Sequence, residues 1–350
     1  MAQNIIGAKP APGPRAKAAK VPSADAPAVH YVHIDEASEG QRLDNFLVKL
    51  LKGVPKSHVY RVIRSGEVRV NKGRAGADTK LNLGDEVRVP PVRTSTTGAE
   101  RGAAAPAREF PLVFEDEHLI AIDKPAGVAV HGGSGVSFGV IEQLRQARPQ
   151  AKFLELVHRL DKETSGLLLI AKKRSALVAL QDQLRQHGGD KAMVKTYSAL
   201  VIGHWPEERK VIDVALHKFL TPEGERRVRA VDDAHEDGKR SITLVKVVQR
   251  FNDFTLLDVT LKTGRTHQIR VHLSTEGHAI VGDEKYGDFG LNKALARGES
   301  AGGHRFDRMF LHARRLRLLH PVTGEPTELA APLPPDCVAL LKHLPLHAST

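Results

Sequence analysis

Apolar positions at helical spacing open the first structured region of the chain. They recur as i, i+3 and i+4 over residues 43–51, and a second helical pattern follows with Ser57 as its expected N-cap. Residues 68–71 and 84–89 alternate apolar and polar side chains, as a half-buried strand does. Residues 29–90 are therefore predicted to form a small α/β domain.

A second region, residues 109–345, carries longer apolar segments. The predicted strands are 119–124, 153–157, 167–171, 195–201, 254–261, 316–320 and 327–330, and the predicted helices are 137–148, 175–187 and a short one after Pro335. Residues 266–273 fit a helix and a strand equally well. Many strands with few helices predict an α+β fold, in which helices flank a large mixed, mostly antiparallel sheet.

Two segments show neither the helical nor the strand spacing of apolar residues. Residues 1–28 are rich in Ala, Pro and Lys, and their five prolines preclude a helix of useful length. We interpret them as a disordered basic tail, with a transit peptide as the weaker alternative. Residues 91–108 lack periodicity as well and are interpreted as a linker between the two domains.

The charge balance indicates a polyanionic partner. The chain has 52 Lys and Arg against 41 Asp and Glu, a net charge of +11 and a pI of about 9.7. Such an excess of cations is typical of proteins that bind nucleic acid, because neutralised phosphates release counterions. The single cysteine, Cys337, excludes an internal disulfide. No apolar run is long enough to cross a bilayer and no secretory signal is visible, so we expect a cytoplasmic protein.

A polar turn between two apolar strands holds one aspartate among basic residues. The turn spans residues 157–166 and places Asp161 beside His158, Arg159 and Lys162. A turn between strands is a rigid mount for a reactive side chain, although a surface charge cluster has the same pattern. An aspartate among cations is an anion at neutral pH, which suits it to act as a nucleophile or a base.

Other kinds of site lack their residue patterns. No H-E-x-x-H or EF-hand spacing is present, and no Gly-Lys-Ser/Thr closes a phosphate-binding loop. A retaining glycosidase needs a second carboxylate, and Glu163 lies too near Asp161 in sequence to point to the same place. Chemistry by a single carboxylate is the prediction that is left.

The first domain resembles the S4 RNA-binding module. The residues that carry this resemblance are R-L-D-x-F-L at 42–47 and I-R-x-G-x-V-x-V-N at 63–71. The resemblance implies that the domain holds structured RNA through cations, mainly on phosphates. The cations expected to do so are Arg42, Lys56, Arg61, Arg64 and Arg69.

The second region resembles the RluA-type pseudouridine synthases. Residues 158–166 match their H-R-L-D-x-x-T-S-G signature, and further blocks match in order at 123–131, 195–200, 264–272, 282–287 and 310–313. The resemblance implies isomerisation of uridine to pseudouridine in 23S ribosomal RNA after the base has flipped out of its stack. It also implies that no metal and no cofactor is needed.

The resemblance further implies a role for each matching residue. Asp161 would be the catalytic aspartate, Tyr197 would stack on the target base, and Arg265 would pair with Asp161. Arg159 would occupy the space that the flipped uridine leaves. The expected substrate-binding set is His158, Arg159, Lys162, Thr164, His267 and Arg270, of which the two histidines and the threonine are favoured as supports of the turn.

Some alternatives stay open at this point. Asp161 attacks C6 of the base, attacks C1′ of the ribose or abstracts a ribose proton. The partner is 23S ribosomal RNA, either free or within a pre-50S particle, and the protein is expected to be a monomer without a membrane partner. A synthase for transfer RNA and a non-catalytic, S4-type ribosome-assembly factor are the competing hypotheses.

Overall fold

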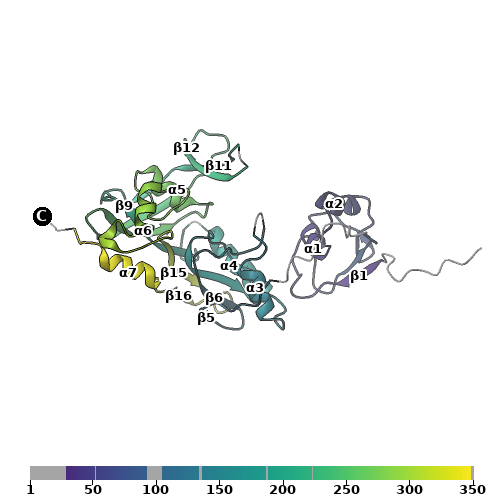
Figure 1. Cartoon of the computed structure of the whole chain (residues 1–350). Coiled ribbons are helices and arrows are strands. Elements are labelled where there is room, and N and C mark those ends of the chain that lie inside the picture. Colours follow the sequence, from purple (N-terminus) through teal and green to yellow (C-terminus); the bar gives the residue numbers. More distant parts are fainter. Residues whose placement is uncertain are drawn as a thin grey trace, which may run out of the picture. The chain divides into compact units, whose positions relative to one another are not determined.

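The computed structural model describes residues 29–347 except for residues 52, 93–104, 134–135, 187 and 223. The chain divides into two compact units, residues 1–99 and 100–350 (Figure 1). The predicted tail and most of the predicted linker lie outside the described residues. In the described ranges, no helix is long and apolar enough to cross a membrane.

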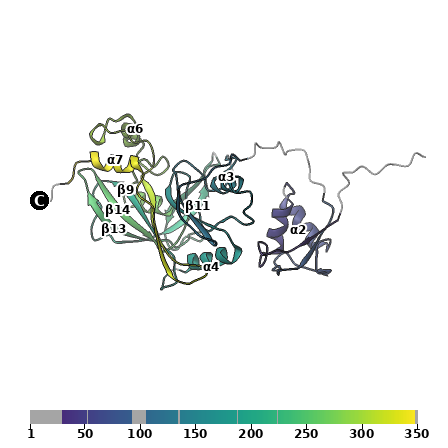
Figure 2. The same cartoon turned by 90° about the horizontal axis from the view of Figure 1, so that it is seen from below.

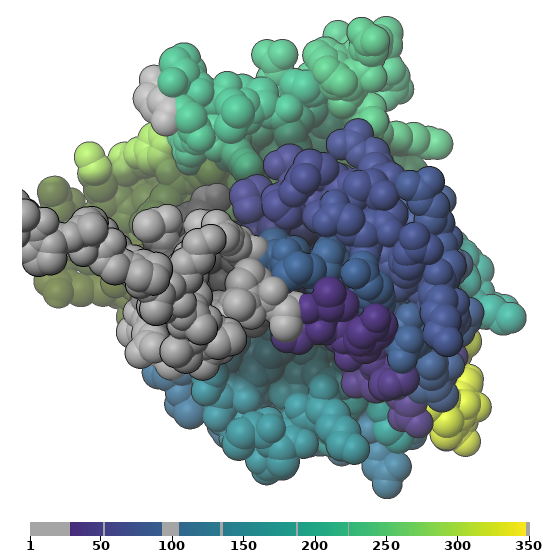
Figure 3. All heavy atoms as spheres, turned by 90° about the vertical axis from the view of Figure 1, so that its right-hand side faces the viewer, coloured from purple at the N-terminus to yellow at the C-terminus, as the bar shows by residue number. Residues whose placement is uncertain are grey.

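The N-terminal unit packs two helices on a small antiparallel sheet. The helices are α1 (Leu43–Leu50) and α2 (Lys56–Arg64), and the strand order is β1 (His30–His33), β4 (Glu86–Val89), β2 (Arg69–Val70) and β3 (Gly73–Arg74). Leu47 and Val62 lie in its core, as their helical spacing predicts. Figure 3 shows the surface of this unit in purple and blue. The predicted cap of α2 is wrong, because Pro55 rather than Ser57 precedes the helix and its carbonyl accepts from Val59.

The C-terminal unit is built on one large sheet. In the described part of the chain this sheet has ten strands, in the order β10 (Val211–Asp213), β13 (Ile242–Arg250), β14 (Phe254–Leu261), β9 (Val194–Ile202), β15 (Leu311–Leu319), β8 (Ser165–Ala171), β6 (Leu119–Lys124) and β5 (Leu112–Glu115), with β7 (Glu155–Leu156) on β8 and β16 (Pro326–Ala330) on β15. The pair β8–β15 is parallel and the other pairs are antiparallel. The predicted mixed, mostly antiparallel α+β fold is confirmed.

Helices cover this sheet on two sides. In Figure 2, α6 (Phe289–Arg297) and α7 (Pro335–His343) lie above the strands, and α4 (Arg174–Arg185) lies below them. Leu295 and Leu340 join α6 and α7 to a core with Phe254 of β14. The other α-helices in the described part of this unit are α3 (Val140–Ala147) and α5 (Gln268–Thr275). The stretch at 266–273, which fitted both periods, therefore contains the start of a helix.

A two-stranded ribbon extends beyond the sheet. It consists of β11 (Ala215–Leu220) and β12 (Arg226–Val231) and stands at the top of Figure 1. Leu216 and Val228 are buried at its base, where they pack against Val271 of α5. This small apolar cluster fixes the base of the ribbon to the helix.

The predicted strand–turn–strand at 153–171 is confirmed, and one glycine makes its geometry possible. Gly166 has φ of +106° at the position where β8 pairs with Ala313 of β15. A Cβ added there would lie 2.7 Å from the backbone nitrogen of Ala313 and nearer still to its carbonyl oxygen. Glycine lets the two strands approach directly beneath the turn that carries Asp161.

We predict that Gly166→Ala destabilises the protein far more than Gly127→Ala. Gly127 has a similar φ of +78° but open space around it, so alanine there costs roughly 1–2 kcal/mol of left-handed strain. At Gly166 an overpacking cost of roughly 1–3 kcal/mol adds to that strain. Urea unfolding of both variants measures the difference, and equal losses of stability would contradict the close approach.

Candidate active site

Asp161 lies in the turn between β7 and β8, and the turn is held from the side of β6. The side chain of Asp161 is 19% exposed, and its carbonyl accepts from the backbone N–H of Thr164 at 3.2 Å. Lys124, at the end of β6, is completely buried. Its Nζ donates to the carbonyl oxygens of Pro125, Val128 and Lys162 at 2.8, 2.8 and 3.1 Å. The buried amine thus ties the turn to the sheet.

A buried polar cluster supports the turn from below. Ser165 Oγ lies 2.9 Å from Nδ1 of His312 on β15 and accepts from Nη2 of Arg308 at 2.7 Å. Burial lowers the pKa of His312 to about 4, so its ring is neutral at physiological pH. Together with Gly166, these contacts fix the start of β8 and therefore the backbone of Asp161.

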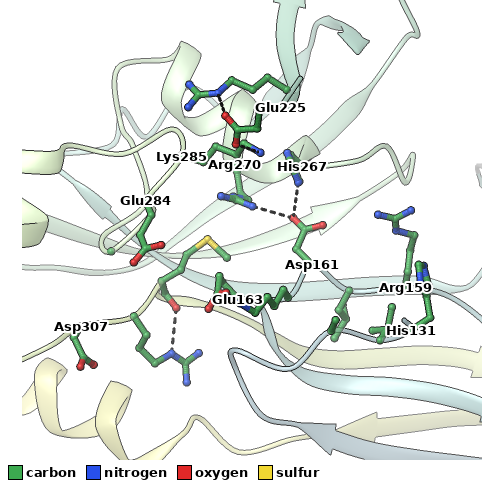
Figure 4. A pocket seen from close by; sticks show the side chains of 18 residues that line it. His131, Arg159, Asp161, Glu163, Glu225, His267, Arg270, Glu284, Lys285 and Asp307 are labelled. Carbon is green, nitrogen blue, oxygen red and sulfur yellow. Dashed lines mark hydrogen bonds and ion pairs between the residues drawn. The ribbon is translucent and has the colours of Figure 1, made fainter. Parts of the chain in front are cut away.

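Arg270 is the closest cation to the Asp161 carboxylate. Its Nη1 lies 3.4 Å from Oδ2 of Asp161 (Figure 4). Its Nε and Nη2 donate to both oxygens of Asp283 at 2.8 and 2.7 Å. Arg270 and Asp283 are 7% and 1% exposed. Burial opposes ionisation of Asp283, but the hydrogen bonds and charge of Arg270 outweigh it and lower the pKa of that carboxyl. A buried ion pair therefore orients a cation toward Asp161.

His267 approaches the same carboxylate oxygen. Its Nε2 lies 3.8 Å from Oδ2 of Asp161 (Figure 4). Its Nδ1 lies 2.7 Å from the hydroxyl of Tyr286. That hydroxyl accepts the backbone N–H of Val228 on β12 at 3.1 Å. Burial lowers the pKa of His267, and the charge of Asp161 offsets this only in part. The neutral ring links Asp161 to the base of the ribbon.

The structure does not pair Arg265 with Asp161, the partnership that the resemblance implied. Arg265 precedes α5, its backbone N–H donates to Oε1 of Gln268 at 3.0 Å, and its side chain is exposed. The partner is Arg270, which lies on the inner face of α5. Arg270, which was expected among the substrate-binding residues, has its guanidinium buried between two carboxylates.

Cavities open on both sides of Asp161. The first is lined by Asp161, Tyr197, Lys195 and Arg265 among others. Burial, and then the charge of Asp161, raise the pKa of Tyr197, so its phenol is neutral at physiological pH. The second cavity, drawn in Figure 4, also contains Asp161 and is bordered by Glu225 and Lys285. A planar ligand can thus lie beside Asp161 against a neutral tyrosine.

Comparison with known proteins identifies the family and the fold. Residues 118–275 match the RNA pseudouridylate synthase family and residues 41–87 match the S4 domain. Ribosomal large subunit pseudouridine synthase C of Escherichia coli K12 is 48% identical over 88% of this chain and 94% of its own length. The chain belongs to the RNA pseudouridylate synthase family. The predicted family and the predicted S4 module are confirmed.

Other relatives agree with this assignment. The protein of the same name from Yersinia pestis is 49% identical over 88% of this chain and 93% of its own length. Among solved structures, human RNA pseudouridylate synthase domain containing 4 is 26% identical with a TM-score of 0.54, over 69% of this chain and 95% of that chain. The similarity therefore extends from the sequence to the fold of a synthase domain.

The other residues predicted for the synthase site fall into two groups. His158 and Thr164 support the turn: Nε2 of His158 accepts the N–H of Leu169 at 3.2 Å, burial lowers the pKa of that histidine to about 3, and Thr164 is buried. Arg159 and Lys162 are exposed at the cavity. Of these two, Lys162 lies 3.5 Å from Glu163. No cluster of His, Cys, Asp or Glu suited to a metal occurs among the described residues.

The cations predicted for the S4 domain are placed as follows. Lys56, Arg61 and Arg64 are exposed on α2, and Arg69 is exposed on β2. Arg42 is bound to Asp44, whose carboxylate also accepts from the hydroxyl of Tyr60, a partnership that the sequence analysis did not anticipate. Two of the exposed cations also have contacts within the domain, since Arg61 Nη2 lies 3.2 Å from Nε2 of His58 and Arg69 donates to the carbonyl of Lys72 at 3.2 Å.

Sequence reasoning missed three supporting residues: Lys124, Asp283 and Tyr286. All three lie in the blocks that matched the family, at 123–131 and 282–287, yet they received no role. Lysine is rarely buried without partners, so a lysine that ends an apolar strand was an available signal. The pairing of Asp283 with Arg270 had no local signal, because it depends on how α5 packs.

Asp283→Asn is predicted to remove part of the pH dependence of stability. The native pKa of Asp283 is lowered, so its stabilising effect is complete above the ordinary carboxyl pKa of about 3.9 and is lost as pH falls through the lower native value. We expect a loss of roughly 3–5 kcal/mol at pH 7, because Arg270 is left buried without its main partner.

Urea unfolding from pH 7 to pH 3 measures this effect. The gap in unfolding free energy between wild type and Asp283→Asn should narrow toward pH 3. Asp253→Asn, a change at an exposed carboxylate in the β13–β14 turn, is the matched control and should follow the wild type. A gap that is the same at both ends of the pH range contradicts the buried ion pair.

Proposed function

We propose that the protein isomerises uridines of large-subunit ribosomal RNA to pseudouridine, with Asp161 as the reactive carboxylate. The observation that carries this proposal is the position of Asp161, 3.4 Å from Arg270 in a cavity that also contains Tyr197. The RNA class comes from the names of the relatives, which are ribosomal large subunit pseudouridine synthases.

The reaction transfers C1′ of the ribose from N1 to C5 of the uracil base. The bond from C1′ to N1 breaks, a bond from C1′ to C5 forms, the hydrogen on C5 leaves as a proton, and N1 takes up a proton. Attack of Asp161 on C6, attack on C1′ and removal of a ribose proton all need an ionised, oriented carboxylate. Arg270 supplies the orientation, because its own position is fixed by Asp283.

Tyr197 and Arg159 have distinct roles in this proposal. The neutral phenol of Tyr197 stacks on the target base and assists removal of the C5 proton once that base is in place. Arg159 is exposed at the rim of the cavity and has no acceptor among the described residues. It fills the space that the uridine leaves when it flips, which lowers the cost of unstacking.

The proposal includes the setting of the reaction. The protein works as a cytoplasmic monomer on 23S ribosomal RNA or on a pre-50S particle, and it uses neither a metal nor a cofactor. The exposed cations Lys56, Arg61, Arg64 and Arg69 of the S4 domain hold structured RNA by its phosphates. The net charge of +11 favours such binding.

Two alternatives make different predictions. A non-catalytic assembly factor has no need for Asp161 to be paired with a buried arginine in a cavity, so that geometry favours the enzyme. A synthase that acts on transfer RNA would use the same site with a different partner. Both relatives named for the large ribosomal subunit favour ribosomal RNA.

Release of tritium from C5-labelled uridine tests the proposal. Wild-type protein should release label from large-subunit ribosomal RNA and much less from transfer RNA, because isomerisation displaces the C5 hydrogen. Asp161→Asn should abolish release while it still binds the RNA, and Tyr197→Phe should slow release. If the wild type releases no label, or Asp161→Asn releases as much as the wild type, the proposal fails.

A further inference from the structure

Arg265, which does not pair with Asp161, stands where two cavities meet. It lines the catalytic cavity together with Asp161 and Tyr197. Arg265 and Thr266 also line a separate groove at the base of the β11–β12 ribbon, whose other polar side chains include Lys218 and Lys239. The groove and the catalytic cavity therefore adjoin at these two shared residues.

The groove is strongly basic. Lys218, Lys239 and Arg265 are exposed, and none of their side chains has an acceptor among the described residues. One carboxylate, Asp237, lies on the same groove, so three positive charges face one negative charge. Cations that are exposed and unpaired in the free protein are available to an anionic ligand without breaking an internal ion pair.

The walls of the groove are fixed relative to the reactive carboxylate. The segment that carries Lys239 pairs with β11 through two backbone hydrogen bonds to Leu216, both 2.9 Å. Leu216 and Val228 pack on Val271 of α5, the helix that carries Arg270. Since Arg270 contacts Asp161, the distance from the lysines to the catalytic carboxylate is set by packed elements rather than by a free loop.

The ribbon presents a further feature that suits nucleic acid. On β11 and β12, Phe219 and Arg229 form a cation–aromatic pair, with the guanidinium carbon 5.4 Å from the ring centroid. Arg229 is exposed and Phe219 is partly exposed. Arginine beside an aromatic ring is a common surface for unstacked nucleotides. The ribbon thus combines phosphate-binding charge with a side chain on which a base can stack.

We propose that this groove binds the sugar-phosphate backbone of single-stranded RNA that adjoins the target uridine, with Lys218, Lys239 and Arg265 on the phosphates. The inference rests on the proposed function, because the RNA enters the groove from the catalytic cavity past Arg265. Flipping a uridine pulls its neighbours out of helical geometry, and a fixed row of cations stabilises the backbone in that extended form.

Binding measurements test the groove without relying on chemistry. The probe is a labelled fragment of large-subunit ribosomal RNA that contains a uridine on which the protein acts, with unpaired nucleotides on both sides of it. The variant is Lys218→Gln/Lys239→Gln, and the control is Lys152→Gln/Lys246→Gln, which removes the same charge from exposed positions outside the groove. Both pairs are compared with wild type over a range of salt concentrations.

The groove variant should raise Kd about tenfold and lower the slope of log K against log salt by about 0.7 for each lysine, while the control stays near wild type. Two shorter fragments, one without the nucleotides on the 5′ side of the target uridine and one without those on its 3′ side, identify which flanking strand the groove binds. On the fragment that lacks the bound strand, groove variant and wild type should bind alike. Equal effects of the two variants, or a variant effect that is the same on every fragment, would overturn the proposal.

An acidic peptide is the other ligand that the charge of the groove allows. Polyglutamate should compete weakly with the RNA fragment at equal charge concentration, and strong competition that the groove variant abolishes would assign the groove to a protein partner instead. All of these measurements report binding. If the protein did not isomerise uridine, these binding measurements could therefore still be interpreted. If the groove did not bind RNA, the tritium assay would still test the proposed function.

Discussion

The position of the reactive carboxylate depends on a buried arginine. Arg270 contacts Asp161 at 3.4 Å and is itself held by two hydrogen bonds to Asp283. A buried guanidinium is costly unless its charge is matched, and Arg270 as a residue is only 7% exposed, so its position is set by the two carboxylates together. The interaction joins three segments that are distant in sequence: the turn after β7, helix α5 and the loop at 282–287.

The turn that carries Asp161 is constrained from the opposite side as well. Lys124 binds the carbonyl of Lys162, and the left-handed Gly166 lets β15 lie against β8 immediately after the turn. Ser165 is held by His312 and Arg308. Backbone restraint from the sheet and side-chain restraint from α5 therefore converge on one carboxylate. Such preorganisation lowers the reorganisation that the reaction itself would otherwise require.

Much of this arrangement was predictable from local sequence signals. The strands predicted at 119–124 and 254–261 match β6 and β14 at both ends, because each is a mostly apolar run with clear polar or turn residues on either side. The turn around Asp161 was predicted from the same kind of pattern. Family resemblance added Tyr197, which does line the cavity with Asp161.

Interactions that arise only from packing were not predictable. Residues 266–273 fitted two periods, so the sequence did not show that the helix begins at Gln268 and turns Arg270 toward Asp161, while Arg265 stays in the segment before the helix. The pair of Arg270 with Asp283 joins the helix to a separate loop, so no spacing rule reports it. The basic groove has the same origin, because Lys218 and Lys239 meet Arg265 only after the ribbon packs on α5.

The most direct test of the account is the single-turnover rate of isomerisation at saturating protein for Arg270→Met, Asp283→Asn and the double variant. If the buried pair positions Asp161, each single variant should slow the reaction roughly 10²-fold or more, and the double variant should be little slower than either, because the two residues act as a unit. Folded Arg270→Met or Asp283→Asn protein that reacts at the wild-type rate would contradict the account.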